Sequence, residues 1–360
     1  MNRLHNFCAG PCTLPTGVLE QLSNDMVDFQ GSGMSLIEMS HRAKIYDEIH
    51  HGTMDSLRRL YNAPDDVDIL LLQGGASLQF AMVPMNVMTP VDKAAYVVSG
   101  TWGKKAFEDA QLCGNAYVAW SGADEGYSRM PDLSDLAIED DTKYLHITSN
   151  ETIGGIRMAD FHDYGVRQVA DMSSDYLSRP IPWDLFDVVY GGAQKNLGPA
   201  GLAVVFVRKS VLENDVSHLP SYLRYDLHAE ADSLANTPPV FAIWATGLML
   251  GWMEQNGGVE GMQARASQRS SMIYDAIHAS DGFYSSPVRA EDRSHMNIVF
   301  TLADAGLETE FFAQADSLGL ANLKGHRSVG GVRASVYNAL PTESVQVLVE
   351  FMTTFAASKG

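Results

Sequence analysis

The feature of this chain that most constrains its fold is a regular alternation of short apolar runs with longer amphipathic segments. The first apolar run, 68–72, is followed by Gly74-Gly75 and by a helical pattern from Ala76 to Met88. Six similar runs follow, at 94–98, 116–120, 144–148, 168–171, 188–190 and 202–207. Such alternation is typical of a mostly parallel sheet covered by helices on both faces. We therefore predict an α/β fold with a mostly parallel seven-stranded sheet.

The second part of the chain predicts a smaller unit. A long helical pattern begins after Pro238-Pro239, continues to Gln255 and is broken by Asn256-Gly257-Gly258. Helix and strand patterns then continue at 296–302, 308–318, 332–336 and 342–357. We predict a large domain over residues 16–255 and a smaller α+β C-terminal domain over residues 256–360, with which residues 1–15 pack.

The net charge and the cysteine spacing exclude several kinds of partner and of structural site. The 360 residues include 25 Lys and Arg against 44 Asp and Glu, a formal net charge of −19. This balance argues against nucleic acid or an anionic membrane surface as a partner. Cys8, Cys12 and Cys113 show no paired spacing, so we predict neither a disulfide framework nor a metal site. No stretch is apolar enough to span a bilayer, and we expect a cytoplasmic protein.

A lysine in a loop rich in Gly and Pro is the strongest chemical signal. Lys195 follows Gly191-Gly192 and precedes Gly198-Pro199, so neither helix nor strand continues there. Small neighbours leave room for a bulky ring beside a lysine that must form an imine. Asp171 ends the apolar run before this one. Such a pair is expected of a pyridoxal phosphate (PLP) site, where the carboxylate meets the pyridinium nitrogen. The alternative for Asp171 is a strand-end cap.

Two further segments suit a phosphorylated aromatic cofactor. The segment 73–77 joins a strand to a helix, where free amide groups favour an anion, although the pattern G-x-G-x-x-G of dinucleotide sites is absent. Trp102 lies between Gly100 and Gly103 after a strand. It could stack on a ring, and its alternative role is that of a core residue.

Several motifs together resemble the phosphoserine aminotransferase family of class-V, fold-type I enzymes. The resemblance covers essentially the whole chain, and its motifs are Asn6-Phe7, Ala9-Gly10-Pro11, Ser40-His41-Arg42, 191–201, Asn236-Thr237-Pro238-Pro239 with Phe241, Lys324-Gly325-His326-Arg327 and 332–338. It implies a large PLP-binding domain with a smaller C-terminal domain.

The resemblance also implies roles around the cofactor. Lys195 and Asp171 are the implied catalytic residues, and Thr152 is the implied partner of the ring's phenolic oxygen. Trp102 is implied to stack on the ring. The implied contacts to the cofactor phosphate are Ala76, Ser77, Gln194 and, across a two-fold interface from the partner, Asn236 and Thr237. Some relatives carry arginine in place of Ser77, so a substrate contact through that arginine is absent here. On spacing alone, a helix N-terminal cap is the favoured role of Asn236-Thr237, and the resemblance reverses this preference.

The substrate is implied to be held at both ends. Arg333 is assigned to the α-carboxylate, and the distal phosphate or side-chain carboxylate is assigned to His41, Arg42, His326 and Arg327. The implied reaction transfers the amino group of L-glutamate to 3-phosphohydroxypyruvate and gives O-phospho-L-serine and 2-oxoglutarate. It belongs to serine biosynthesis, follows ping-pong kinetics and is carried out by a homodimer with shared active sites.

Three alternatives stay open at this point. A serine–glyoxylate aminotransferase would have little use for the His-Arg pairs, since its substrate has no phosphate. A cysteine desulfurase would need a mobile nucleophilic cysteine, and none of the three lies in an evident catalytic loop. A non-catalytic or dinucleotide-binding α/β protein would not form an imine with PLP.

Overall fold

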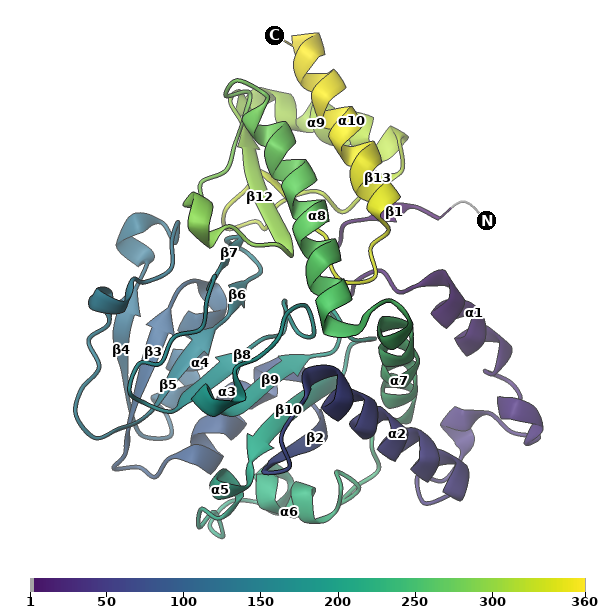
Figure 1. Cartoon of the computed structure of the whole chain (residues 1–360), viewed down its shortest axis with the longest axis vertical. Coiled ribbons are helices and arrows are strands. Elements are labelled where there is room, and N and C mark those ends of the chain that lie inside the picture. The colour runs from purple at the N-terminus through teal and green to yellow at the C-terminus, as the bar shows by residue number, and fades with distance from the viewer. Residues whose placement is uncertain (1–2, 360) are drawn as a thin grey trace.

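A seven-stranded sheet forms the centre of the computed structural model, which describes residues 3–359 (Figure 1). All neighbouring strands are parallel except those that pair with β10, which runs antiparallel to both β2 and β9. The predicted fold class, a mostly parallel seven-stranded sheet, is therefore confirmed. In spatial order the strands are β2 (Val67–Gln73), β10 (Leu202–Arg208), β9 (Phe186–Gly192), β8 (Gln168–Asp171), β5 (Thr142–Thr148), β3 (Lys93–Val98) and β4 (Asn115–Ser121).

Alternate residues of each strand enter opposite cores, because successive side chains of a strand point to opposite faces. In β10, Val204 and Phe206 pack in one core, and Val205 and Val207 pack in the other. The first face is covered by α2 (Lys44–Tyr61), α7 (Val240–Gln255) and the start of α8 (Gly258–His278). The second is covered by α3 (Gly75–Val87), α4 (Thr101–Ala110), α5 (Lys209–Leu212) and α6 (Tyr225–Glu230). Burying each large apolar side chain contributes about 1.5–3 kcal/mol.

The parallel strands bring several loops to one edge of the sheet. Strands β3, β5, β8 and β9 run in the same direction, and β2 runs with them because two antiparallel pairings separate β2 from β9. Their carboxyl ends therefore lie along the same edge, where ligands of open α/β sheets gather. The loops after these strands lead to the residues whose chemistry the sequence singled out, including Trp102, Asp171 and Lys195.

The C-terminal part has its own apolar core. It contains the sheet β11 (Tyr284–Ser285), β12 (Asn297–Leu302) and β14 (Val332–Ser335), with helices α9 (Glu308–Ser317) and α10 (Thr342–Lys359). Near the N-terminus, β1 (His5–Asn6) pairs with β13 (Leu320–Ala321), and Phe7 enters this core. Helix α8 joins the units, because Val259 lies in the first core and Ile277 in this one. The division at residue 255 stays a prediction.

The remaining elements are short. Helix α1 (Thr16–Asn24) precedes α2, and β6 (Asn150–Glu151) pairs with β7 (Ile156–Arg157). The 3₁₀ helices lie in the connections, at Phe29–Gly31, Leu36–Glu38, Ala123–Glu125, Leu133–Asp135, Trp183–Leu185, Ser221–Leu223, Ala290–Asp292 and Ala305–Leu307.

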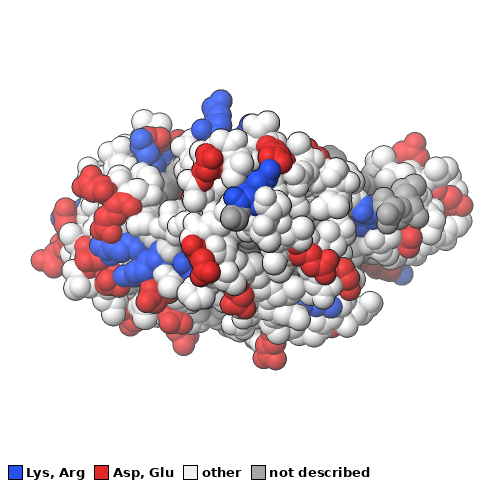
Figure 2. Space-filling model, turned by 90° about the horizontal axis from the view of Figure 1, so that it is seen from above, with Lys and Arg blue, Asp and Glu red and all other residues white. Residues whose placement is uncertain are grey.

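The acidic residues outnumber the basic ones, with 44 Asp and Glu against 25 Lys and Arg. On the face that Figure 2 shows, Asp and Glu are scattered, and Lys and Arg lie singly or in small groups. That face therefore presents no continuous basic surface of the kind that binds nucleic acid. Within residues 3–359, no helix is both long enough and apolar enough to cross a membrane.

Candidate active site

An open cavity of about 270 Å³ lies at the carboxyl edge of the sheet. Six of the residues predicted to bind the cofactor line it together: Ala76, Ser77, Trp102, Asp171, Gln194 and Lys195. Pro11, Phe80 and Ser173 also line the cavity, and no role was predicted for them there. Segments far apart in the sequence thus converge on one space, as expected at the ends of neighbouring parallel strands.

Lys195 lies in the turn that follows β9, and its side chain is buried. Its Nζ donates a hydrogen bond of 2.5 Å to Oγ1 of Thr152 and lies 5.4 Å from the centre of the Trp102 ring. Burial lowers the pKa of Lys195 below its usual value of 10.5, while the carboxylates of Asp171 and Glu151 act in the opposite direction. A lysine with a lowered pKa is more readily the neutral amine, which is its nucleophilic form.

Asp171 ends β8, and its buried carboxylate faces the same cavity. Oδ1 accepts hydrogen bonds from the backbone N–H (2.9 Å) and the hydroxyl (2.6 Å) of Ser173, whose oxygen accepts one from Gly192 N–H. This link ties the carboxylate to the strand that leads to Lys195. Burial raises the pKa of Asp171, although Lys195 lowers it. A buried carboxylate is costly without a cation, so this position fits a ligand with a protonated ring nitrogen.

Glu151 supports the site through Trp102, although no role was predicted for it. It is fully buried, and its carboxylate accepts the N–H groups of Gly103 (2.9 Å) and Trp102 (3.4 Å) in the first turn of α4. A carboxylate there satisfies free amides and suits the positive end of the helix dipole. Burial raises the pKa of Glu151 to about 7. The only sequence signal was its place next to Thr152, because burial cannot be read from a single acidic residue.

Two buried polar atoms near the cavity have no hydrogen-bond partner among the described residues. They are Nε1 of Trp102 and Oε1 of Gln194, and both residues line the cavity. Buried polar groups are normally satisfied, so an orphaned donor and acceptor beside one space indicate a ligand or water there. Together with Asp171 and Lys195, these atoms fit a polar aromatic cofactor.

The first turn of α3 offers the cavity a place for an anion. Gly74 and Gly75 adopt positive φ angles of 88° and 62°, and Ala76 and Ser77 follow in the helix. A side chain at Gly74 would be strained at this angle, and its Cβ would lie 2.6 Å from Cδ2 of Leu78. The N–H groups of such a turn have no partners within the helix and favour an anionic group.

Arg333 of β14 also reaches the site. Its Nη1 donates a hydrogen bond of 3.5 Å to the carbonyl oxygen of Thr152, the residue that accepts from Lys195. In the preceding loop, His326 is half-buried and Arg327 is exposed. Burial lowers the pKa of His326, and the charges of Arg333, Arg327 and Lys105 lower it further. Nζ of Lys105 lies 4.9 Å from the Trp102 ring. Cationic side chains therefore gather on the Arg333 side of the site.

Eight of the predicted residues do not line the cavity of this chain: His41, Arg42, Thr152, Asn236, Thr237, His326, Arg327 and Arg333. Arg42 is exposed just before α2, and Thr237 is exposed beside the last residue of β2, where its carbonyl oxygen accepts a hydrogen bond from Gln73. Their roles toward cofactor or substrate stay predictions.

Comparison with known proteins shows the family to which the chain belongs. Residues 4–348 match the aminotransferase class-V family. The phosphoserine aminotransferase of Lysinibacillus sphaericus is 49% identical over 354 residues, which cover 98% of each chain. Of solved structures, phosphoserine aminotransferase from Bacillus circulans subsp. alkalophilus superimposes with a TM-score of 0.97 at 47% identity, with 99% of each chain covered. The PLP-bound phosphoserine aminotransferase of Trichomonas vaginalis gives 0.92 at 36% identity, covering 97% of this chain and 99% of that one.

The fold and the family match define the class of protein as an aminotransferase of class V. Within that class, the chain belongs to the phosphoserine aminotransferase family, whose members it matches from end to end. The resemblance first seen in the short motifs is thereby confirmed.

Proposed function

We propose that this chain is a PLP-dependent transaminase that converts 3-phosphohydroxypyruvate and L-glutamate into O-phospho-L-serine and 2-oxoglutarate in serine biosynthesis. The observation that carries the proposal is the cavity in which buried Lys195 and buried Asp171 face the same space beside Trp102. The family to which the chain belongs supports the particular substrates.

The cavity residues divide the task of holding PLP. The first turn of α3, with Ala76 and Ser77, would hold the phosphate, and Trp102 would cover the ring. Asp171 would keep the ring nitrogen protonated, because its carboxylate is fixed by Ser173 and costly to leave unpaired. When bound, the cofactor supplies an electron sink for charge that develops at the substrate's Cα.

Lys195 would hold and move the proton of that Cα. Its lowered pKa makes the neutral amine accessible, and Thr152 Oγ1 orients Nζ through their 2.5 Å hydrogen bond. A base must lie within hydrogen-bond reach of the proton that it takes, and the cavity that Lys195 lines gives a substrate such access. The same amine returns the proton in the second half of a ping-pong cycle.

The cationic side of the cavity would bind the substrate's two anionic ends. Arg333, beside Thr152, would take the α-carboxylate, while His326 and Arg327 would take the distal phosphate. Arg42 and Thr237 are exposed on their own chain, and Thr237 contacts Gln73, which does not line the Lys195 cavity. We therefore propose a homodimer with shared active sites, in which His41, Arg42, Asn236 and Thr237 reach the cavity of the partner chain.

The experiment that tests this function is a panel of keto acids offered to the purified enzyme with L-glutamate. We expect 3-phosphohydroxypyruvate to exceed glyoxylate and pyruvate in kcat/KM by at least about tenfold, since one charge-assisted contact contributes about 1.5–3 kcal/mol. Equal use of glyoxylate would favour a serine–glyoxylate aminotransferase. An enzyme with lysine-bound PLP has a visible absorption band that borohydride abolishes. If the purified protein has no such band, it is not a PLP enzyme.

We also propose a cytoplasmic location for the enzyme. All three cysteines are free and partly buried, as is usual where the surroundings keep thiols reduced. Fractionation of the native host's cells, followed by activity measurement, tests this part.

A further inference from the structure

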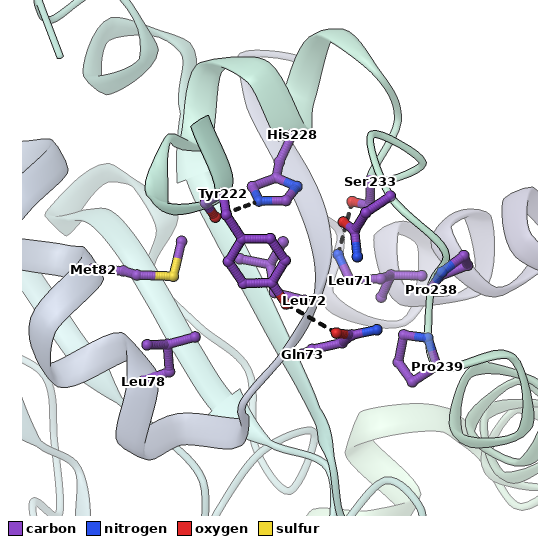
Figure 3. A pocket seen from close by; sticks show the side chains of 11 residues that line it. Leu71, Leu72, Gln73, Leu78, Met82, Tyr222, His228, Ser233, Pro238 and Pro239 are labelled. Atoms are coloured by element: carbon purple, nitrogen blue, oxygen red, sulfur yellow. Dashed lines mark hydrogen bonds between the residues drawn. The ribbon is translucent and has the colours of Figure 1, made fainter. Parts of the chain in front are cut away.

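A second, smaller cavity lies along the outer edge of β2 and shares no lining residue with the Lys195 cavity (Figure 3). Strand β2 is at the end of the sheet, so only one of its edges pairs with a neighbouring strand. The unpaired backbone N–H and C=O groups of such an edge strand are usually covered by another segment of the protein. The segment 233–239 provides this cover, because Ser233 Oγ accepts the N–H of Leu71 at 2.9 Å and the Thr237 carbonyl lies against Gln73.

The amide nitrogen and the amide oxygen of the Gln73 side chain each form a hydrogen bond. Nε2 donates to the carbonyl oxygen of Thr237 at 2.9 Å. Oε1 accepts from the hydroxyl of Tyr222 at 2.9 Å (Figure 3). Tyr222 is held in turn, since its carbonyl accepts from Nε2 of His228 at 2.8 Å. A carbonyl can only accept, so the Thr237 contact requires an NH₂ group at this position. Glutamate would present an oxygen there.

The backbone of Gln73 leads to the other cavity. Gln73 is the last residue of β2 and directly precedes Gly74, Gly75 and the first turn of α3. One residue therefore begins the anion-binding turn of its own chain and holds the segment that carries Asn236 and Thr237.

We propose that Gln73 is a positioning residue for the partner's active site: its amide fixes the Asn236–Thr237 segment in the conformation that contacts the partner's cofactor phosphate. This inference rests on the proposed function, in which the segment reaches across the dimer. It predicts that damage to the Gln73 side chain weakens PLP binding in the partner's cavity rather than in its own.

Gln73→Glu is the variant of choice, because it keeps the acceptor for Tyr222 and places an oxygen against the Thr237 carbonyl. We expect the dissociation constant for PLP in the facing site to rise about tenfold, which corresponds to about 1.4 kcal/mol. Tyr222→Phe removes only the bond that orients the amide, so we expect a smaller rise. Gln346→Glu, on the exposed side of α10, is the matched control for the added charge.

The experiment uses mixed dimers purified through two different affinity tags, freed of cofactor and titrated with PLP. The visible band of lysine-bound cofactor reports only the site that retains Lys195. In the first mixture, a wild-type chain pairs with a Lys195→Ala, Gln73→Glu chain, so the reporting site faces the altered segment. In the second, a Gln73→Glu chain pairs with a Lys195→Ala chain, so the reporting site has the altered residue in its own chain.

The two mixtures give opposite results if Gln73 acts across the interface. We expect weakened PLP binding in the first and affinity within twofold of a wild-type and Lys195→Ala mixture in the second. Weakening only in the second, equal weakening in both, or none in the first overturns the proposal.

A further mixture separates this inference from the proposed function. Wild type paired with a Lys195→Ala, Thr237→Glu chain should also bind PLP weakly. If it binds normally, the shared site itself is wrong. If it binds weakly while the Gln73 mixture binds normally, only the inference about Gln73 is wrong.

Discussion

The Lys195 cavity and the segments that carry His41–Arg42 and Asn236–Thr237 are built in opposite ways. The cavity is assembled by one chain, at the ends of neighbouring strands, and its central groups are buried and joined by hydrogen bonds. Arg42 and Thr237 are exposed on segments that precede helices. The fold of one chain therefore fixes the residues of the Lys195 cavity, whereas the residues of the other two segments acquire their proposed role only through a second chain.

The largest expected effect concerns the centre of the cavity. Lys195→Ala removes both the amine that binds the cofactor and the proton carrier, so we expect turnover to fall at least about 1,000-fold, or about 4 kcal/mol of barrier. Steady-state turnover and the visible band of lysine-bound PLP provide the measurement. Lys104→Ala, an exposed lysine paired with Glu108, is the control and should leave both unchanged. Near-normal turnover of the Lys195 variant would contradict the assignment.

Asp171→Asn should lower turnover by a smaller factor than Lys195→Ala. A neutral amide fits the space beside Ser173 but no longer favours a protonated ring nitrogen, so we expect PLP to remain bound and kcat to fall by about 100-fold, or about 2.7 kcal/mol. Single-turnover kinetics with L-glutamate measure the step directly. A rate within a factor of two of wild type would mean that Asp171 only caps the strand.

The two regions should respond differently to substrate when their arginines are removed. Arg333→Ala should lower kcat/KM for every amino acid, because all share the α-carboxylate, by an amount that corresponds to about 1.5–3 kcal/mol. Arg42→Ala should impair phosphohydroxypyruvate and glutamate but spare alanine, which has no distal anion. Steady-state kinetics with the three substrates give the pattern. Equal losses across substrates for both variants would refute the two-ended clamp.

The last expected effect is on stability rather than on turnover, and it concerns Glu151, which supports Trp102 within one chain. Its pKa of about 7 lies above its usual value of 4.5, so between these pH values the folded protein binds a proton that the unfolded chain does not. Stability due to this group therefore falls as pH rises from about 4.5 to 7. Glu151→Gln removes that dependence, and its stability relative to wild type should rise by about 3 kcal/mol across this window. Urea unfolding of the cofactor-free proteins measures it; parallel pH curves would contradict the role of burial.

The sequence predicted the sheet well because most of its strands are buried on both faces and are therefore continuous in apolar residues. Asp171 and Lys195 could be located because Asp171 ends such a strand and Lys195 follows one. Glu151 could not, since its importance comes from burial against the first turn of α4. Helix α8 was also missed: Gly257-Gly258 reads as a break, yet the helix begins at Gly258 and enters both cores.

The central claim is that each active site combines the cavity of one chain with the Asn236–Thr237 segment of another. Co-refolding equal amounts of Lys195→Ala and Thr237→Glu chains tests it most directly. The first variant lacks the reactive amine, and the second places a carboxylate against the partner's cofactor phosphate. Half of the dimers are mixed, and each mixed dimer has one intact site of two, so the account predicts about a quarter of wild-type activity. Activity that never exceeds the mean of the two parent proteins would show that each site belongs to a single chain.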